Sequence, residues 1–144
     1  MPSVALNGAT ISESTASGHI NYERYEYWYT DQDGYDHYHW VGGYTTYATI
    51  RGSCNASPNG VYFNGKNAVL QGDRTTENDQ YSIPDGRYQS GAHSGASGSV
   101  TSGNGKNVFI GGKSVSVNGS TISTHAGTSS TINGGVSNNV YIGG

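Results

Sequence analysis

The sequence has very little cysteine, leucine, methionine or charge. Its single cysteine, Cys54, cannot form an internal disulfide and is either a buried side chain or a metal ligand. Leucine occurs twice and methionine once, which leaves too few strong helix formers for a helical bundle. Charged residues make up 12% of the chain, and no basic patch offers a surface for nucleic acid. No apolar run is long enough to cross a membrane, and the first residues do not resemble a signal peptide.

The abundant residues indicate β-structure. The chain contains 23 glycines and many Ser, Thr and Asn residues, and its apolar residues are mostly Val, Ile and Tyr. These apolar side chains suit half-buried pleated surfaces, and the Gly-Asn-Ser clusters divide them into many short strands. With 33% hydrophobic residues the core must be thin. The length is that of one domain, so we expect a single all-β domain over residues 1–144.

Two short patterns recur along the chain. An aromatic strand ending in glycine occurs three times, at 59–66, 107–113 and 139–144. A second pattern occurs at 4–12 and at 115–123, with six of the nine positions identical. The Asn-Gly and Gly-Gly pairs between apolar runs indicate hairpin turns, because both pairs tolerate positive φ. Three units follow, spanning 4–60, 61–107 and 108–144. Because one unit cannot bury its own apolar face, we expect a small pseudo-threefold cone of short β-hairpin repeats.

Each unit carries one histidine in the loop that follows its turn, namely His19, His93 and His125. Equivalent loops of a threefold object meet at one end, so the three imidazoles are predicted to converge on a metal ion. Zinc fits such a ligand set, with iron as the alternative. The competing interpretation is three scattered surface histidines in glycine-rich loops. A structural metal would stabilise a thin core, since zinc contributes roughly 10–16 kcal/mol to small zinc-dependent folds.

The fourth ligand and the question of catalysis depend on the neighbouring residues. Cys54 is the candidate fourth ligand, and its alternative is a buried apolar filler. A metalloenzyme would also need a general base beside the metal. Glu13 is the close carboxylate, and the loop of the second unit, which carries His93, contains four acids that could reach: Asp73, Glu77, Asp79 and Asp85. We expect a structural metal and no enzymatic activity.

A tyrosine-rich segment at about 20–50 interrupts the first unit and reads as a hairpin with its turn at Asp33-Gly34. Strand alternation predicts two faces. One face holds Arg24, Glu26 and Trp28 with Tyr35, His37 and His39. The other holds Tyr25, Tyr27 and Tyr29 with Asp36, Tyr38 and Trp40.

Three interpretations of this hairpin compete. It packs against the side of the cone and extends the core, or it is an interaction surface for a neighbouring protein or a surface glycan, since aromatic residues favour interface centres. In the third interpretation, His37 and His39 form a second metal site. The candidate surface residues are Tyr25, Tyr27, Trp28, Tyr29 and Trp40.

Several segments taken together resemble the PAAR-repeat proteins. They are the opening residues 1–4, the hairpins ending in Gly-Lys at 61–66 and 108–113, the Gly72-Asp73 turn and the ending 139–144. These proteins form the pointed tips of contractile injection machines. The likeness covers the chain apart from the insertion, although the literal Pro-Ala-Ala-Arg is absent and Asn7-Gly8 and Asn118-Gly119 replace two Gly-Asp turns. We interpret the chain as a divergent, PAAR-like member.

The resemblance implies a spike-tip protein, with histidines and commonly a cysteine holding zinc near its point. One monomer would cap a trimeric spike, of the VgrG type or its phage equivalent, through the flat base opposite the histidine loops. It would help to pierce the target cell envelope. The expected location is the tail tip of a phage virion, or the cytoplasm before injection by a secretion machine such as type VI. The alternative function is a carbohydrate- or receptor-binding β-protein that acts through the tyrosine-rich hairpin.

Overall fold

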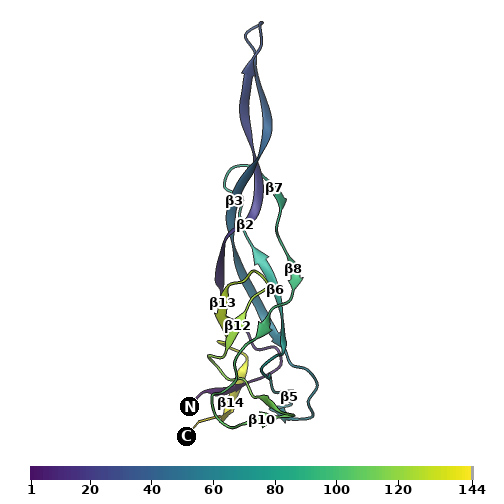
Figure 1. Cartoon of the computed structure of the whole chain (residues 1–144), viewed down its shortest axis with the longest axis vertical. Helices are drawn as coiled ribbons and strands as arrows, with labels where there is room; N and C mark the ends of the chain where they lie inside the picture. Colours follow the sequence, from purple (N-terminus) through teal and green to yellow (C-terminus); the bar gives the residue numbers. More distant parts are fainter. Residues whose placement is uncertain (144) are drawn as a thin grey trace.

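The computed structural model describes residues 1–143, which form strands and turns and no helix. The strands are β1 (Ser3–Ala5), β2 (Ser14–Thr30), β3 (Asp36–Asn55), β4 (Tyr62–Phe63), β5 (Lys66–Asn67), β6 (Arg74–Gln80), β7 (Arg87–Ser90), β8 (Ser94–Ala96), β9 (Ser99–Val100), β10 (Phe109–Ile110), β11 (Lys113–Ser114), β12 (Thr121–Ser123), β13 (Ser129–Thr131) and β14 (Val136–Tyr141). The predicted all-β class is therefore confirmed. Figure 1 shows a long tapering molecule, with both termini at the broad base and the β2–β3 hairpin at the opposite end. No helix among the described residues could span a bilayer.

A cyclic set of backbone hydrogen bonds joins the three repeats at the base. The amide of Ala5 donates to the carbonyl of Ser116 (3.0 Å), Ser116 donates to Val69 (2.8 Å), and Val69 donates to Ala5 (2.9 Å). Each repeat thus bonds to the next, and the third bonds back to the first. The repeat pattern of the sequence therefore corresponds to a pseudo-threefold arrangement in space.

The turn after each of these segments has the same conformation in all three repeats. Gly8, Gly72 and Gly119 have φ of +89°, +96° and +93°, which side chains rarely adopt. Their amides donate at 2.8–2.9 Å to the carbonyls of Cys54, Val100 and Ile132. These glycines turn each repeat away from the base and into a rising hairpin.

Three hairpins of very different length rise from these turns. Their lowest paired positions are Thr10 with Ser53, Arg74 with Ser99, and Thr121 with Thr131. The strands join in the order β13-β12-β9-β6-β3-β2-β7, and β8 pairs with β6. The amide of Ser12 donates to the carbonyl of Thr131 (2.8 Å), so the first and third hairpins also meet. At this level the three hairpins enclose a common interior.

The buried apolar residues fill that interior in layers. The lowest layer consists of Val4, Leu6, Ala68, Leu70, Val115, Val117 and Ile142. Above it pack Ala5, Ala9, Ile11, Cys54, Val69, Val100, Ile122 and Ile132. A third cluster, of Ala16, Ile20, Ala48 and Ile50, lies between β2 and β3. The small size of these residues explains how a chain so poor in large apolar side chains still has a closed core.

The first hairpin is longer than the predicted 20–50 segment, and its distal part stands free. β2 and β3 pair from Ser14 and Ile50 up to Thr30 and Asp36, and β7 pairs with β2 only as far as Glu23. We call residues 24–41 the distal ribbon. It forms the narrow end of the molecule (Figure 1). The interpretation in which this hairpin packs against the cone and extends its core therefore holds for the lower part, where Ile20, Ala48 and Ile50 are buried and the strands pair with β6 and β7. It is wrong for residues 24–41, which extend the long axis instead.

The register of the distal ribbon agrees with the predicted faces except near Trp28. Tyr25 lies opposite Trp40 and Tyr27 opposite Tyr38, as alternation predicts. The register then shifts between Tyr27 and Tyr29, so that Tyr29 lies opposite His37. Tyr29 therefore stacks on His37, at 4.5 Å between ring centroids, and does not continue the tyrosine row.

Candidate metal centre

The three predicted histidines meet in one place, although they are far apart in sequence. His19 lies in β2, His93 directly precedes β8, and His125 lies in the turn between β12 and β13. The ring centroids form a nearly equilateral triangle, with 5.4 Å from His19 to His93, 5.8 Å from His19 to His125, and 5.1 Å from His93 to His125. Each rising hairpin thus contributes one imidazole.

Asp79, from β6, completes the group. Its Oδ2 lies 2.9 Å from Nε2 of His19 and 3.1 Å from Nδ1 of His93, and its Oδ1 lies 2.8 Å from Nε2 of His125. One ligand atom from each of the four residues lies within 4.8 Å of the other three. Three nitrogens and one carboxylate oxygen are a donor set that a divalent cation such as zinc accepts.

Two of these atoms are buried without a hydrogen bond, which is the clearest sign that the cluster fits a cation. Nε2 of His125 and Oδ1 of Asp79 face each other, yet neither makes a hydrogen bond within residues 1–143. Buried polar atoms are rarely left in this condition. A cation coordinated by both atoms would satisfy the two lone pairs at once.

Glu77 sets the orientation of the His125 ring. Its Oε1 lies 2.6 Å from Nδ1 of His125 and accepts the backbone N–H of the same residue at 2.8 Å. Its Oε2 accepts a hydrogen bond from the Thr75 hydroxyl. With the ring proton on Nδ1, the lone pair of Nε2 points towards the cluster, as in the carboxylate–histidine–metal arrangement of many metal sites.

The environment of Asp79 keeps its carboxyl group ionised. Burial alone would raise its pKa, but hydrogen bonds from the backbone N–H of His93 and from the rings of His19 and His93 outweigh this effect. The electrostatic effect of the neighbouring His125 imidazole acts in the same direction, so the net result is a lowered pKa. An ionised carboxylate is the form that binds a metal.

The sequence alone indicates neither a ligand role for Asp79 nor a supporting role for Glu77, only that acids near His93 could reach the histidines. The usable signal is the alternation Thr75, Glu77, Asp79 along β6, because every second side chain of a strand points to the same side. All three side chains point inward, and those of Glu77 and Asp79 have no exposed surface.

Cys54, the predicted fourth ligand, lies instead in the apolar core. Its amide donates to Ala9 at 2.7 Å, and its carbonyl accepts from Gly8. Val100 and Ile132 make the same pair of bonds in the other two repeats. Burial, with a smaller effect from nearby carboxylates, raises the pKa of the Cys54 thiol to about 12. The position therefore requires a small apolar side chain, and the thiol stays protonated.

A Cys54→Ala variant is expected to keep its full metal content, because the thiol is not part of the cluster. The free energy of unfolding should fall by about 1 kcal/mol, the cost of a small core cavity. Metal per chain by plasma mass spectrometry, together with urea unfolding, measures both quantities. Loss of the metal in this variant would return Cys54 to the ligand set.

The other predicted histidines are engaged elsewhere. His37 Nε2 lies 2.8 Å from Oδ2 of Asp31, and His39 stacks on Trp28 with 4.9 Å between ring centroids. Within residues 1–143, the only group of three or more candidate ligands is the one around Asp79. The arrangement of His37 and His39 therefore gives no support to a second metal site.

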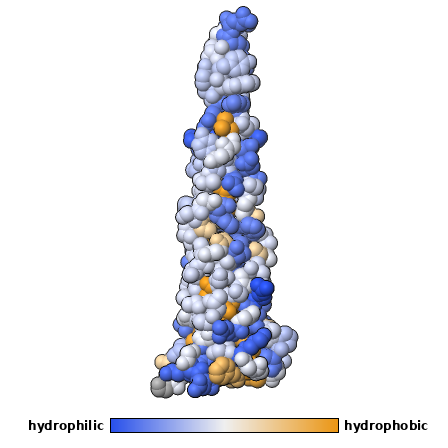
Figure 2. Space-filling view, in the orientation of Figure 1, coloured by the Kyte–Doolittle hydropathy of each residue, from blue (hydrophilic) through white to orange (hydrophobic). Residues whose placement is uncertain are grey.

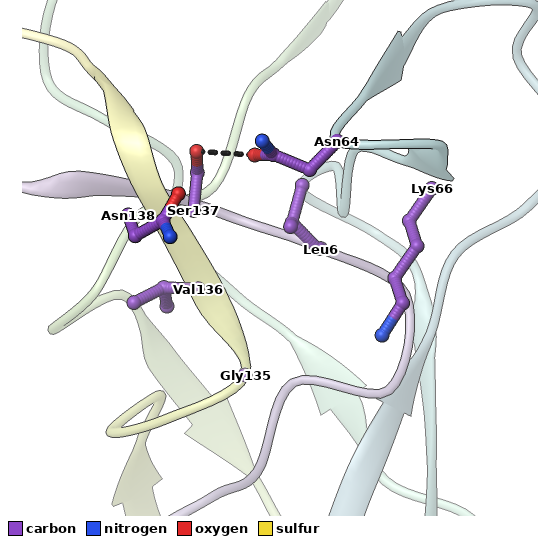
Figure 3. A pocket seen from close by; sticks show the side chains of 7 residues that line it. All are labelled: Leu6, Asn64, Lys66, Gly135, Val136, Ser137 and Asn138. Atoms are coloured by element: carbon purple, nitrogen blue, oxygen red, sulfur yellow. Dashed lines mark hydrogen bonds between the residues drawn. The ribbon is translucent and has the colours of Figure 1, made fainter.

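A shallow cavity at the base, lined by residues of all three repeats, has no comparable chemistry. It is lined by Leu6, Asn64, Lys66 and residues 135–138 (Figure 3). The Ser137 hydroxyl donates to the Asn64 side chain at 2.6 Å. Lys66 is the only charged residue in the lining, and no acid, histidine or cysteine accompanies it. The cavity therefore lacks the groups needed for catalysis or for holding a metal.

The chain matches no protein-family model, and searches of curated proteins and of solved structures found no match.

Proposed function

We propose that this protein is the apex of a spike in a contractile phage tail or a related injection machine. In this role it caps a trimeric β-helical spike through its base and helps to pierce the target cell envelope. One structural ion, for which the donor set favours zinc, holds the three hairpins together above the core. We also propose that the chain is a divergent, PAAR-like member of the PAAR-repeat proteins.

The observation that carries this proposal is a threefold set of exposed aromatic side chains at the base. Tyr62, Phe109 and Tyr141 occupy the same position in the three repeats, and they are 62%, 56% and 49% exposed. Apolar side chains gather at this end of the molecule (Figure 2). Exposed aromatic residues are typical anchors of protein interfaces. The end of a trimer presents three identical sites, which is the partner geometry that such a set matches.

The metal cluster favours a structural role over catalysis. Four protein ligands close a tetrahedral zinc site, whereas catalytic zinc keeps one position open for water. The Glu77 carboxylate contacts the cluster through His125, and its two oxygens are occupied by His125 and Thr75. It is therefore not free to serve as a general base. We accordingly propose no enzymatic activity.

The test is the stoichiometry of the complex with a trimeric spike. We expect the intact protein, co-expressed with a trimeric β-helical spike protein of the VgrG or phage type, to form a complex of one chain per three spike chains. Size-exclusion chromatography with light scattering measures this ratio. The triple variant Tyr62→Ser, Phe109→Ser, Tyr141→Ser should lose the complex and keep its fold, because the three side chains are exposed.

The matched control is Tyr35→Ser, which removes an aromatic side chain that is 70% exposed at the far tip. It should leave the complex intact. No complex with the parent chain, or a ratio of three to three, would contradict the proposed cap. A complex that survives the triple change would show that the base aromatics are not the contact.

A further inference from the structure

One face of the distal ribbon carries a continuous row of aromatic rings, which we call the tyrosine face: Tyr25, Tyr27, Tyr38 and Trp40. Ring centroids are 6.1 Å apart for Tyr27 and Tyr38, 5.6 Å for Tyr38 and Tyr25, and 5.1 Å for Tyr25 and Trp40. Each side chain is between 40% and 59% exposed. Tyr25 and Tyr38 are close to parallel, with 24° between their ring planes, whereas Tyr27 stands edge-on to Tyr38 at 83°. The row is therefore an open aromatic surface, held in place by contacts among its own rings.

The lower end of the tyrosine face is braced by charged residues. The guanidinium of Arg87 lies 4.0 Å from the centroid of the Trp40 ring. The same group pairs with Glu23, with 2.6 Å between Nε and Oε2. This cation–π contact restricts the ring before any ligand arrives, so less entropy is lost on binding.

At the upper end of the tyrosine face the hydroxyl groups are hydrogen-bonded, whereas those in the middle of the face are not. The hydroxyls of Tyr27 and Thr30 are 2.8 Å apart, and Thr30 donates to Asp36 at 2.7 Å. The hydroxyls of Tyr25 and Tyr38 make no hydrogen bond within the described residues. The face thus combines flat apolar rings with free donors and acceptors, which is the combination that a sugar ring requires.

The charge of the ribbon restricts the class of ligand. Residues 24–41 contain four carboxylates and one cation, Arg24, so the ribbon carries −3 with its histidines neutral. Arg24 is itself paired with Asp85 at 2.9 Å. Such a surface repels anionic polymers. This excludes acidic polysaccharides, phosphate-rich glycans and nucleic acid as preferred ligands.

We infer that the tyrosine face binds a neutral polysaccharide chain by stacking sugar rings on Tyr25, Tyr38 and their neighbours. Alternate residues of a strand are roughly 7 Å apart, so successive rings along the ribbon underlie successive sugars of an extended chain. The opposite face is less suited, because Trp28 and Tyr29 are already stacked on His39 and His37. This inference concerns the end of the molecule opposite the base and does not depend on the proposed cap.

The test uses the intact, metal-loaded protein and its own fluorescence, since both tryptophans of the chain lie in the ribbon. The probes are malto-, cello- and laminari-oligosaccharides, with oligogalacturonate as the anionic comparison. We expect at least one neutral oligosaccharide to bind with Kd of about 1 mM or tighter. The double variant Tyr25→Ala, Tyr38→Ala should weaken this binding by about tenfold or more.

Two further variants separate stacking from general damage to the hairpin. Trp28→Ala, on the opposite face, should change the affinity by less than about twofold. The pair Tyr25→Phe, Tyr38→Phe should retain most of it, because the rings remain. Circular dichroism and metal content establish that each variant is folded. The inference is overturned if no neutral oligosaccharide binds, if the double alanine variant binds as the parent does, or if oligogalacturonate binds more tightly.

Discussion

A His125→Ala variant is expected to lose its metal ion and to melt at a much lower temperature than the parent protein. The His125 side chain is only 7% exposed, and it lies between the carboxylates of Glu77 and Asp79, neither of which has any exposed side-chain surface. Removing the imidazole leaves Oε1 of Glu77 and Oδ1 of Asp79 buried without their partner. An uncompensated buried charge costs about 3–5 kcal/mol, and loss of a structural zinc costs more.

The measurements are metal per chain by plasma mass spectrometry and the melting temperature by calorimetry. About one ion per parent chain is the expected content. A chelator added to the parent should reproduce the loss of stability, since the ion binds the folded state alone. His39→Ala, in the distal ribbon, is the control and should change neither quantity. A metal-free parent protein whose melting temperature does not change with His125→Ala would disprove the structural role of the ion.

Substitution of Gly98 by alanine should be nearly as damaging, although this residue touches no metal. A Cβ at Gly98 would lie 2.2 Å from Oε2 of Glu77 and 2.5 Å from the carbonyl oxygen of Ser123. The Glu77 carboxylate cannot move away, because it is buried and holds His125. We expect a loss of about 3 kcal/mol or more in the free energy of unfolding, together with weaker metal binding.

Gly42→Ala is the matched control for this change. A Cβ there would meet only the Gln89 side chain, at an ordinary 3.5 Å, and the backbone has no positive φ. Its effect should stay within about 0.5 kcal/mol. Urea unfolding of the metal-loaded proteins compares the two variants directly. Equal stability of the two would mean that the backbone at Gly98 relaxes and that Glu77 is not held as tightly as its contacts indicate.

The metal site illustrates which parts of a site a sequence reveals. The sequence predicts the cluster of His19, His93 and His125, because a repeat places them in equivalent loops and a threefold arrangement brings equivalent loops together. Asp79 and Glu77 lie in only one of the three repeats, so no periodicity identified them. Cys54 was assigned by chemical type, whereas its true equivalents are Val100 and Ile132, whose backbone bonds it shares.

The sequence by itself determined the class of fold, the three repeats and their turns. Those features depend on local chemistry: strand-forming side chains, and glycines that alone accept positive φ at no steric cost. Tertiary structure alone decided which acid joins the histidines and where the long hairpin points. Both depend on the unequal lengths of the three hairpins and on their pairing, which bring Asp79 of β6 to the histidines and leave the ribbon beyond β7 without a further paired strand. Such contacts join residues far apart in the chain, and no local pattern records them.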